Sequence, residues 1–172
     1  SPLYQQNTLR DAVAAGINLN LFNQHADRVK LAASAPAVNV LQSLILTDAS
    51  KLVLTPTYHV FEMYSVHQDA TLLPVELSAP AYTLGNAKLP ALHASASRDK
   101  QGVLHLTLVN LDPRRSAALT LRTKGATPKR ISARTLSASR LDALNSFDAP
   151  NEVKPAPLEG IQLEANGATL RI

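Results

Sequence analysis

The apolar residues of this chain change their spacing partway along the sequence, and this change limits the possible folds more than any other feature. Up to about residue 54 they recur every three to four positions, as on one face of a helix. After residue 69 they alternate with polar residues, as on one face of a strand. The pattern predicts a mainly β chain, in which a helix–strand–helix unit precedes an antiparallel β-sandwich.

The first part begins with a predicted helix over residues 8–23. Thr8 is a good N-cap residue, and Asp11 follows three positions later, as in a capping box. Residues 28–33 (RVKLAA) then form a short, nearly continuous apolar run. Such a run is typical of a strand that is buried on both faces, so we expect a buried strand here.

A second helix is expected directly after this strand. Ser34 can cap it, and Pro36 falls in its first turn, where a missing N–H does no harm. Its apolar stripe consists of Val38, Leu41, Leu44 and Ile45. Helix, buried strand and helix repeat in β/α barrels, but one strand cannot make a parallel sheet. Residues 1–54 are therefore predicted to be the last, incomplete units of a β/α barrel.

Residues 55–172 are predicted to form the C-terminal β-sandwich domain. A short helix over 58–64, begun near Thr55 and Pro56, comes first. Alternating patterns then predict strands at 72–77, 91–98, 103–110, 117–123, 129–136 and 168–172. Residues 99–102 form a hairpin loop, and the proline-rich stretch 145–157 is expected to be a long extended loop.

The composition excludes several classes of function. The net charge of +4 comes from scattered basic residues, which does not suit a nucleic-acid surface. No cysteine is present, so disulfides, thiolate zinc sites and cysteine nucleophiles are excluded. The longest apolar stretch is far shorter than the roughly 20 residues that span a bilayer. We expect a soluble chain, either cytoplasmic or exported, that binds neither nucleic acid nor membrane.

Neither a metal site nor a catalytic motif is expected. His25 and Asp27 are too close in sequence to share a helix face, and His59 and His67 have no third ligand nearby. His59 and Glu62 would be neighbours on a helix surface, which is usually a solvated pair. The chain also lacks a glycine-rich phosphate loop and a G-x-S-x-G elbow, so no cofactor is expected.

Polar residues on the two predicted helices have two interpretations. They are Asn18, Asn20 and Asn23 on the first helix, and Asn39 and Gln42 on the second. They either satisfy backbone groups and contact neighbouring loops, or they line a site, with Asn39 approaching a sugar-binding pocket. The first interpretation is favoured, because the rest of the barrel is not in the sequence.

Five stretches together resemble the C-terminal part of glycoside hydrolase family 51, the α-L-arabinofuranosidases. In chain order they are LYQQNTLRDA, HADRVKLAASAPAVNVLQSLILTD, LTPTYHVFEMYSVHQDATLLPVEL, ASASRDKQGVLHLTLVNLDP and NSFDAPNEVKPAP. The resemblance covers nearly the whole chain. It implies the end of a catalytic β/α barrel followed by a sandwich of jelly-roll type, which matches the two apolar spacings.

The resemblance also implies an activity that this chain cannot perform alone. The family hydrolyses terminal arabinofuranosyl residues of arabinan and arabinoxylan with retention, which requires two carboxyl groups about 5 Å apart. In the family both glutamates lie upstream of the LYQQNTLRDA block, so most of the barrel is expected before Ser1. The acids that match neither catalytic position are Asp11, Asp27, Asp48, Glu62, Asp69 and Glu76. No catalytic residue is therefore assigned.

One family sugar contact is also missing. After the last barrel strand the family usually reads A-N-x-A-Q-x-V-N-V-L-Q, and the first Gln reaches the arabinose. Here Pro36 stands at that Gln, and Ala33 stands at the usual Asn. Proline has no side-chain donor or acceptor, so no substrate-binding residue is assigned.

The leading hypothesis is a C-terminal fragment or subunit of the enzyme that stabilises its catalytic barrel. The barrel is then the partner of this chain, and the polysaccharide binds only through the barrel. The alternatives are a carbohydrate-binding sandwich and an oligomerisation module that forms a homo-oligomer. The low aromatic content of 4%, with no Trp, argues against the carbohydrate-binding alternative.

Overall fold

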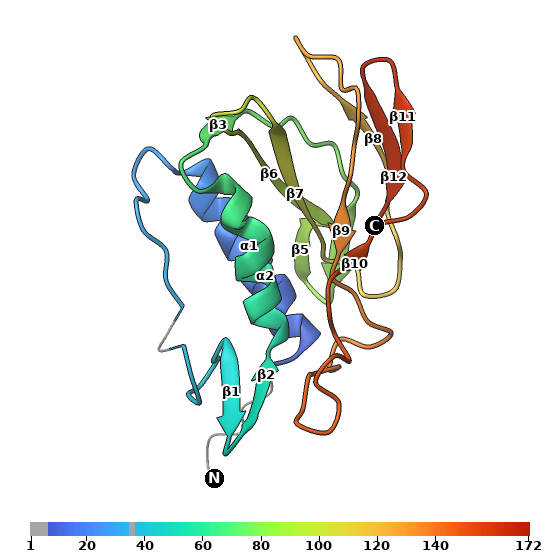
Figure 1. Cartoon of the computed structure of the whole chain (residues 1–172). Coiled ribbons are helices and arrows are strands. Elements are labelled where there is room, and N and C mark those ends of the chain that lie inside the picture. The colour runs from blue at the N-terminus through green and yellow to red at the C-terminus, as the bar shows by residue number, and fades with distance from the viewer. Residues whose placement is uncertain (1–6, 35–36) are drawn as a thin grey trace.

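A computed structural model describes residues 7–34 and 37–172. Figure 1 shows two neighbouring helices with the β1–β2 hairpin below them, and the remaining strands on the other side of the molecule. Helix α1 spans Leu9–Gln24, and helix α2 spans Pro56–Tyr64 and continues into a 3-10 turn, η1 (Ser65–His67). The helices expected over 8–23 and 58–64 are thereby confirmed. As expected, Asp11 caps α1, because its carboxylate accepts from the backbone N–H and the hydroxyl of Thr8.

The described strands pair only with antiparallel neighbours, apart from one isolated parallel bridge, and the mainly β prediction is confirmed. One three-stranded sheet has the order β3 (Thr71–Leu73), β6 (Leu92–Arg98), β7 (Leu104–Asn110). A second has the order β11 (Gln162–Glu164), β12 (Gly167–Arg171), β8 (Ala118–Arg122). From left to right, Figure 1 shows the helix pair, the first sheet and then the second.

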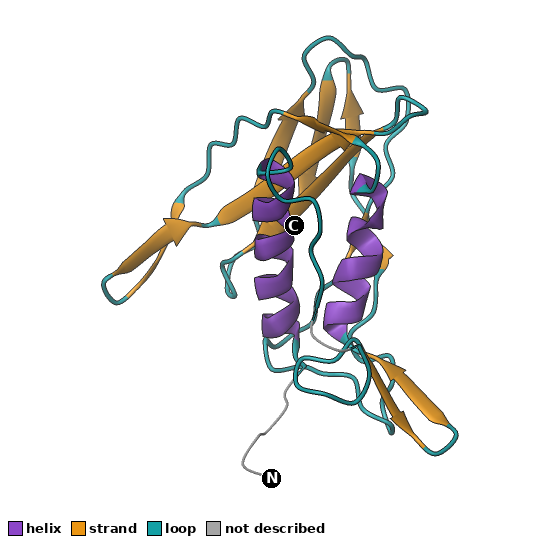
Figure 2. Ribbon diagram, turned by 90° about the vertical axis from the view of Figure 1, so that its left-hand side faces the viewer, coloured by secondary structure: helices purple, strands orange, loops and turns teal. Residues whose placement is uncertain are grey.

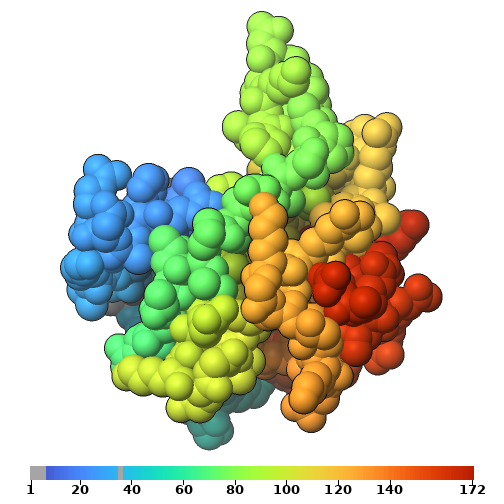
Figure 3. All heavy atoms as spheres, turned by 90° about the horizontal axis from the view of Figure 1, so that it is seen from above, coloured from blue at the N-terminus to red at the C-terminus, as the bar shows by residue number. Residues whose placement is uncertain are grey.

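Three two-stranded ribbons complete the described strands. They are β1 (Ile45–Asp48) with β2 (Lys51–Leu54), β4 (Ala81–Leu84) with β5 (Ala87–Pro90), and β9 (Arg134–Thr135) with β10 (Ala156–Pro157). The sequence did not predict the first two ribbons, and the strand expected over 129–136 is only two residues long. Figure 2 shows the β4–β5 hairpin extending away from the helices, and Figure 3 shows its residues projecting from the body.

The prediction of a buried strand over residues 28–33 is wrong. The segment has no strand assignment, and Leu31 is 86% exposed. A strand needs hydrogen-bonded neighbours, and a strand buried on both faces needs layers on both sides. Within the described residues, no strand pairs with this segment.

The second helix predicted from Ser34 onward is also wrong for the part that can be described. Residues 37–44 form bends and turns, and Ile45 already belongs to β1. Asn39 has a positive φ of 53°, and its side chain bonds the backbone N–H and the hydroxyl of Thr47. Local bonds of this kind compete with a helix. Pro36 lies outside the described residues, so its place in the first turn of a helix stays a prediction.

The main apolar core lies between the two helices and the long loop near the C-terminus. Its buried members are Leu9, Ala12, Val60, Ala143 and Val153. The loop is fixed by Asn145, whose amide donates to the carbonyl oxygens of Leu54 and Val153 and accepts from the Val153 N–H. The beginning of α1 and the loop that contains Ala143 and Val153 therefore belong to one packed unit.

Gly16 lies where the backbone of α1 approaches the first sheet closely. A Cβ added there would lie 3.0 Å from Cγ2 of Val109 on β7 and 3.4 Å from the Tyr64 hydroxyl on α2. We expect Gly16→Val to destabilise the chain by about 2 kcal/mol, because overpacking would push α1 off the sheet. Thermal unfolding measures this loss. Ala14→Val, at an exposed position of the same helix, should cost less than about 1 kcal/mol. Equal losses in both variants would contradict the close approach.

Candidate functional site

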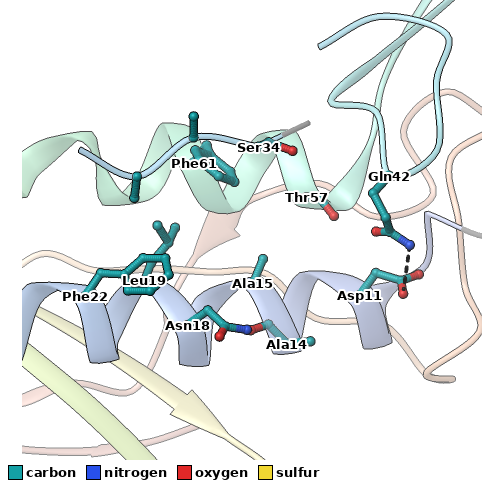
Figure 4. A pocket seen from close by; sticks show the side chains of 12 residues that line it. Asp11, Ala14, Ala15, Asn18, Leu19, Phe22, Ser34, Gln42, Thr57 and Phe61 are labelled. Atoms are coloured by element: carbon teal, nitrogen blue, oxygen red, sulfur yellow. Dashed lines mark hydrogen bonds between the residues drawn. The ribbon is translucent and has the colours of Figure 1, made fainter. Parts of the chain in front are cut away.

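A groove of about 370 Å³ between the two helices is the first candidate site. Figure 4 shows its side chains: α1 provides one wall, α2 the other, and the segment that ends at Ser34 crosses above them. The lining is mostly apolar, with Ala15, Leu19, Phe22 and Phe61 along its length. The polar residues Asp11, Gln42 and Thr57 lie at one end.

The chemistry of this groove is limited. Asp11 is the one carboxylate among the described lining residues, and one of its oxygens already caps α1. The Gln42 amide approaches its other oxygen at 3.5 Å. Thr57 is only 5% exposed, and its hydroxyl has no hydrogen-bond partner in the described structure. A single carboxylate cannot provide the acid and nucleophile of a retaining glycosidase. The groove instead has the character of a packing surface.

The other residues considered from sequence do not converge. Within residues 7–34 and 37–172, no three acidic or histidine side chains could hold a metal ion. Glu62 pairs with Arg134 at 3.0 Å, and burial lowers the pKa of His59. Asn18 donates to the Ala14 carbonyl oxygen, and Asn39 is exposed and bonded to Thr47. These two asparagines support the interpretation that polar residues here satisfy local groups.

Asn20 is the centre of a buried polar cluster between α1 and the first sheet. It is 0% exposed, and its Oδ1 accepts hydrogen bonds from Ser95 on β6 (2.8 Å) and Thr107 on β7 (2.7 Å). The Tyr64 hydroxyl lies 3.0 Å from the same oxygen and donates to the Gly16 carbonyl at 2.9 Å. The cluster thus joins both helices to β6 and β7.

Two more residues extend this polar cluster to either end. Asn23 donates to the Ser95 hydroxyl at 3.0 Å, and His67 of η1 contacts the hydroxyls of Ser97 and Thr107. Burial is the main reason that the pKa of His67 falls to about 4. Burial also raises the pKa of Tyr64 to about 12. Both groups are therefore neutral at pH 7, as a buried hydrogen-bonded cluster requires.

Sequence reasoning selected Asn20 and Asn23 but missed the residues that they contact. Ser95, Ser97 and Thr107 alternate with apolar residues in their strands, and this local pattern does not relate them to α1. The available signal was the helix itself, since a polar residue on the apolar face of α1 needs polar partners opposite.

The fold and the site define a class of protein before any comparison. The chain is mainly β with antiparallel strands, and its two helices border an open groove beside an unpaired apolar segment, which is typical of an accessory domain that packs against further protein. Among the described residues, no helix is long and apolar enough to cross a membrane.

The chain belongs to the α-L-arabinofuranosidase C-terminal domain family, whose pattern it matches over residues 1–172. It is 44% identical over 171 residues to an intracellular exo-α-L-arabinofuranosidase of Bacteroides ovatus, covering 99% of this chain and 33% of that protein. The crystal structure of the family 51 arabinofuranosidase from Xanthomonas axonopodis pv. citri has a TM-score of 0.95 at 40% identity, covering 99% of this chain and 34% of that one.

A family 51 α-L-arabinofuranosidase from Bifidobacterium longum is also similar, with a TM-score of 0.84 at 26% identity over 96% of this chain and 33% of that one. The chain therefore spans about a third of the length of the relatives that it matches. The resemblance inferred from sequence is confirmed, and the fold is that of a C-terminal domain in this family.

The polar cluster gives a direct test of how α1 is held. We expect Asn20→Leu to cost about 3 kcal/mol, because the Ser95 and Thr107 hydroxyls would remain buried without their acceptor. Asn18→Leu, on the exposed side of α1, should change stability by less than about 0.5 kcal/mol. Urea unfolding of the three proteins measures the difference, and an unchanged midpoint for Asn20→Leu would show that the cluster carries little stability.

Proposed function

We propose that this chain is the C-terminal part of an α-L-arabinofuranosidase and completes a catalytic β/α barrel without providing catalytic residues. In this proposal residues 1–54 are the last barrel units and residues 55–172 the C-terminal β-sandwich domain. The observation that carries it is the segment 28–33, which has the composition of a buried strand but lies unpaired and exposed.

The surface around this segment supports docking of further barrel structure. Phe22, Leu31, Val38 and Leu41 are exposed large apolar residues, and they come from α1 and from the chain that follows it. The helix groove lies on the same part of the molecule, and Ala32, Ala33 and Ser34 border it. Exposed large apolar side chains near an apolar groove are typical of an interaction site. Its complement is the two thirds of the relatives' length that this chain does not cover.

The proposed activity belongs to the complete enzyme. It is the retaining hydrolysis of terminal arabinofuranosyl residues, with both glutamates on the barrel strands that this chain lacks. The printed descriptions of the relatives name arabinofuranosidases, which supports this reaction class. The chain on its own is expected to bind no sugar and to hydrolyse none.

Leu31 provides a test that separates docking from folding. Leu31→Asp should leave the unfolding temperature of this chain unchanged, because the side chain is 86% exposed. The same variant should lose binding to the N-terminal two thirds of the Bacteroides ovatus relative, since it would bury an unpaired carboxylate. Isothermal titration calorimetry measures the binding, and hydrolysis of an aryl arabinofuranoside measures the restored activity.

Leu163→Asp is the matched control, because Leu163 is 49% exposed on β11, in the second sheet. It should bind and restore activity like the unchanged chain. Equal binding by Leu31→Asp, or hydrolysis by this chain alone, would overturn the proposed function.

Pro36 bears on how well the complete site would hold arabinose. The family Gln at this position reaches the sugar, and proline removes that hydrogen bond, which is worth about 1–3 kcal/mol in a polar site. In a chimera with the N-terminal part of the Bacteroides ovatus relative, we expect Pro36→Gln to lower KM roughly tenfold. Ala37→Gln is the control, and steady-state kinetics give the result. An unchanged KM would show that another residue has taken over this contact.

A further inference from the structure

The 3-10 turn is attached to the first sheet through both ring nitrogens of His67. Nδ1 lies 2.7 Å from the Ser97 hydroxyl on β6, and Nε2 lies 3.2 Å from the Thr107 hydroxyl on β7. Thr107 in turn contacts Asn20 Oδ1 at 2.7 Å. His67 therefore connects η1, β6, β7 and α1 through a continuous series of hydrogen bonds.

Counting the donors assigns the proton on this ring. Thr107 has one hydroxyl hydrogen, and its shortest contact is with Asn20 Oδ1 at 2.7 Å, which can only accept; the Ser95 hydroxyl and carbonyl oxygens lie farther away, at 2.9 and 3.3 Å. The Thr107 oxygen must then accept from His67, which places the ring hydrogen on Nε2. Nδ1 is left with a lone pair and accepts from Ser97. This neutral tautomer gives the Ser97 hydroxyl, the His67 Nε2–H and the Thr107 hydroxyl one acceptor each.

A second proton on the His67 ring would disrupt this series of hydrogen bonds. It would turn Nδ1 into a donor facing the Ser97 hydroxyl, which is itself donating. Ser97 is 4% exposed, and its side chain has no other hydrogen-bond partner in the described structure. Reversing its hydroxyl would leave a buried donor unpaired, which is costly.

The surrounding groups do not offset the extra charge. On β7, His105 is 2.9 Å from Asp99, and that carboxylate also accepts from the backbone N–H groups of Gln101 and Val103. On α2, the Tyr64 ring meets the His67 ring edge-on at 5.8 Å. Asp69, two residues after His67, pairs with Lys100 at 3.7 Å in an exposed position. In the described structure every nearby carboxylate is thus already paired.

We propose that His67 is an acid-sensitive latch, which holds η1 and α1 on the first sheet while it is neutral and releases them when it gains its second ring proton. This device lies wholly within the chain and goes beyond the proposed function. Because burial, and then His105, lower the pKa of His67 from 6.5 to about 4, the folded state binds fewer protons than the unfolded chain between these values. The stabilisation is complete above pH 6.5 and is lost as the pH falls through about 4.

The first experiment compares thermal unfolding of the 172-residue chain and its His67→Gln variant from pH 7.5 to pH 4. Glutamine keeps one donor and one acceptor but cannot titrate. We expect the unfolding temperature of the unchanged chain to fall by about 5 °C more than that of the variant. His25→Gln, at an exposed histidine, is the control and should follow the unchanged chain. Parallel curves for the His67→Gln variant and the unchanged chain would overturn the proposal.

A second measurement keeps the proposal testable if His67→Gln does not fold. Nitrogen NMR of the histidine rings reports the tautomer and the titration midpoint of His67 in the unchanged chain. We expect Nε2–H and a midpoint well below 6.5. In Ser97→Ala the midpoint should rise, because Nδ1 loses its donor. An Nδ1–H tautomer, or a midpoint near 6.5, would overturn the proposal.

Discussion

Helix α1 is held on the first sheet by buried hydrogen bonds to Asn20, and the arrangement of the helical part depends on this contact. Apolar packing alone could hold the helix at several rotations. Asn20 Oδ1 accepts from hydroxyls on two neighbouring strands, so one rotation of the helix gives both hydroxyls their acceptor, while Asn20 Nδ2 is buried without a partner among the described residues. Hydrogen bonds between buried side chains favour one arrangement, because any other would leave more polar groups unpaired. Gly16 makes the contact possible, because its missing side chain lets the helix backbone approach Val109.

The beginning of the helix pair is held by the long loop that includes residues 141–145. Leu9 and Arg10 donate their backbone N–H groups to the carbonyl oxygens of Ala143 and Leu141. These bonds satisfy two of the donors that a helix start leaves free. The long loop therefore helps to cap α1, and Asn145 attaches the same loop to Leu54, the last residue of β2. Two regions with different apolar spacing are joined in this way by the last quarter of the sequence.

Local pattern predicted the elements that depend on local properties. The strands at 91–98 and 103–110 and the cap of α1 follow from alternation and from residue spacing. The hairpin over 45–54 was missed because its first residue, Ile45, was assigned to a helical stripe. Asn39 and Gln42, inside that predicted helix, adopt positive φ values that break a helix. The polar cluster was beyond prediction for a different reason. Asn20 meets partners 75 and 87 positions away, and no spacing rule connects them.

The wrong prediction over residues 28–33 is the most informative of these differences. Burying a leucine side chain contributes about 1.5–3 kcal/mol, so a fold seldom leaves such a residue in solvent when a core position is available. Leu31 nevertheless has 86% of its surface exposed, in a segment without strand partners. The composition suits an environment that the described residues do not provide. This exposed segment beside an open apolar groove is the observation on which the proposed docking of further barrel structure rests.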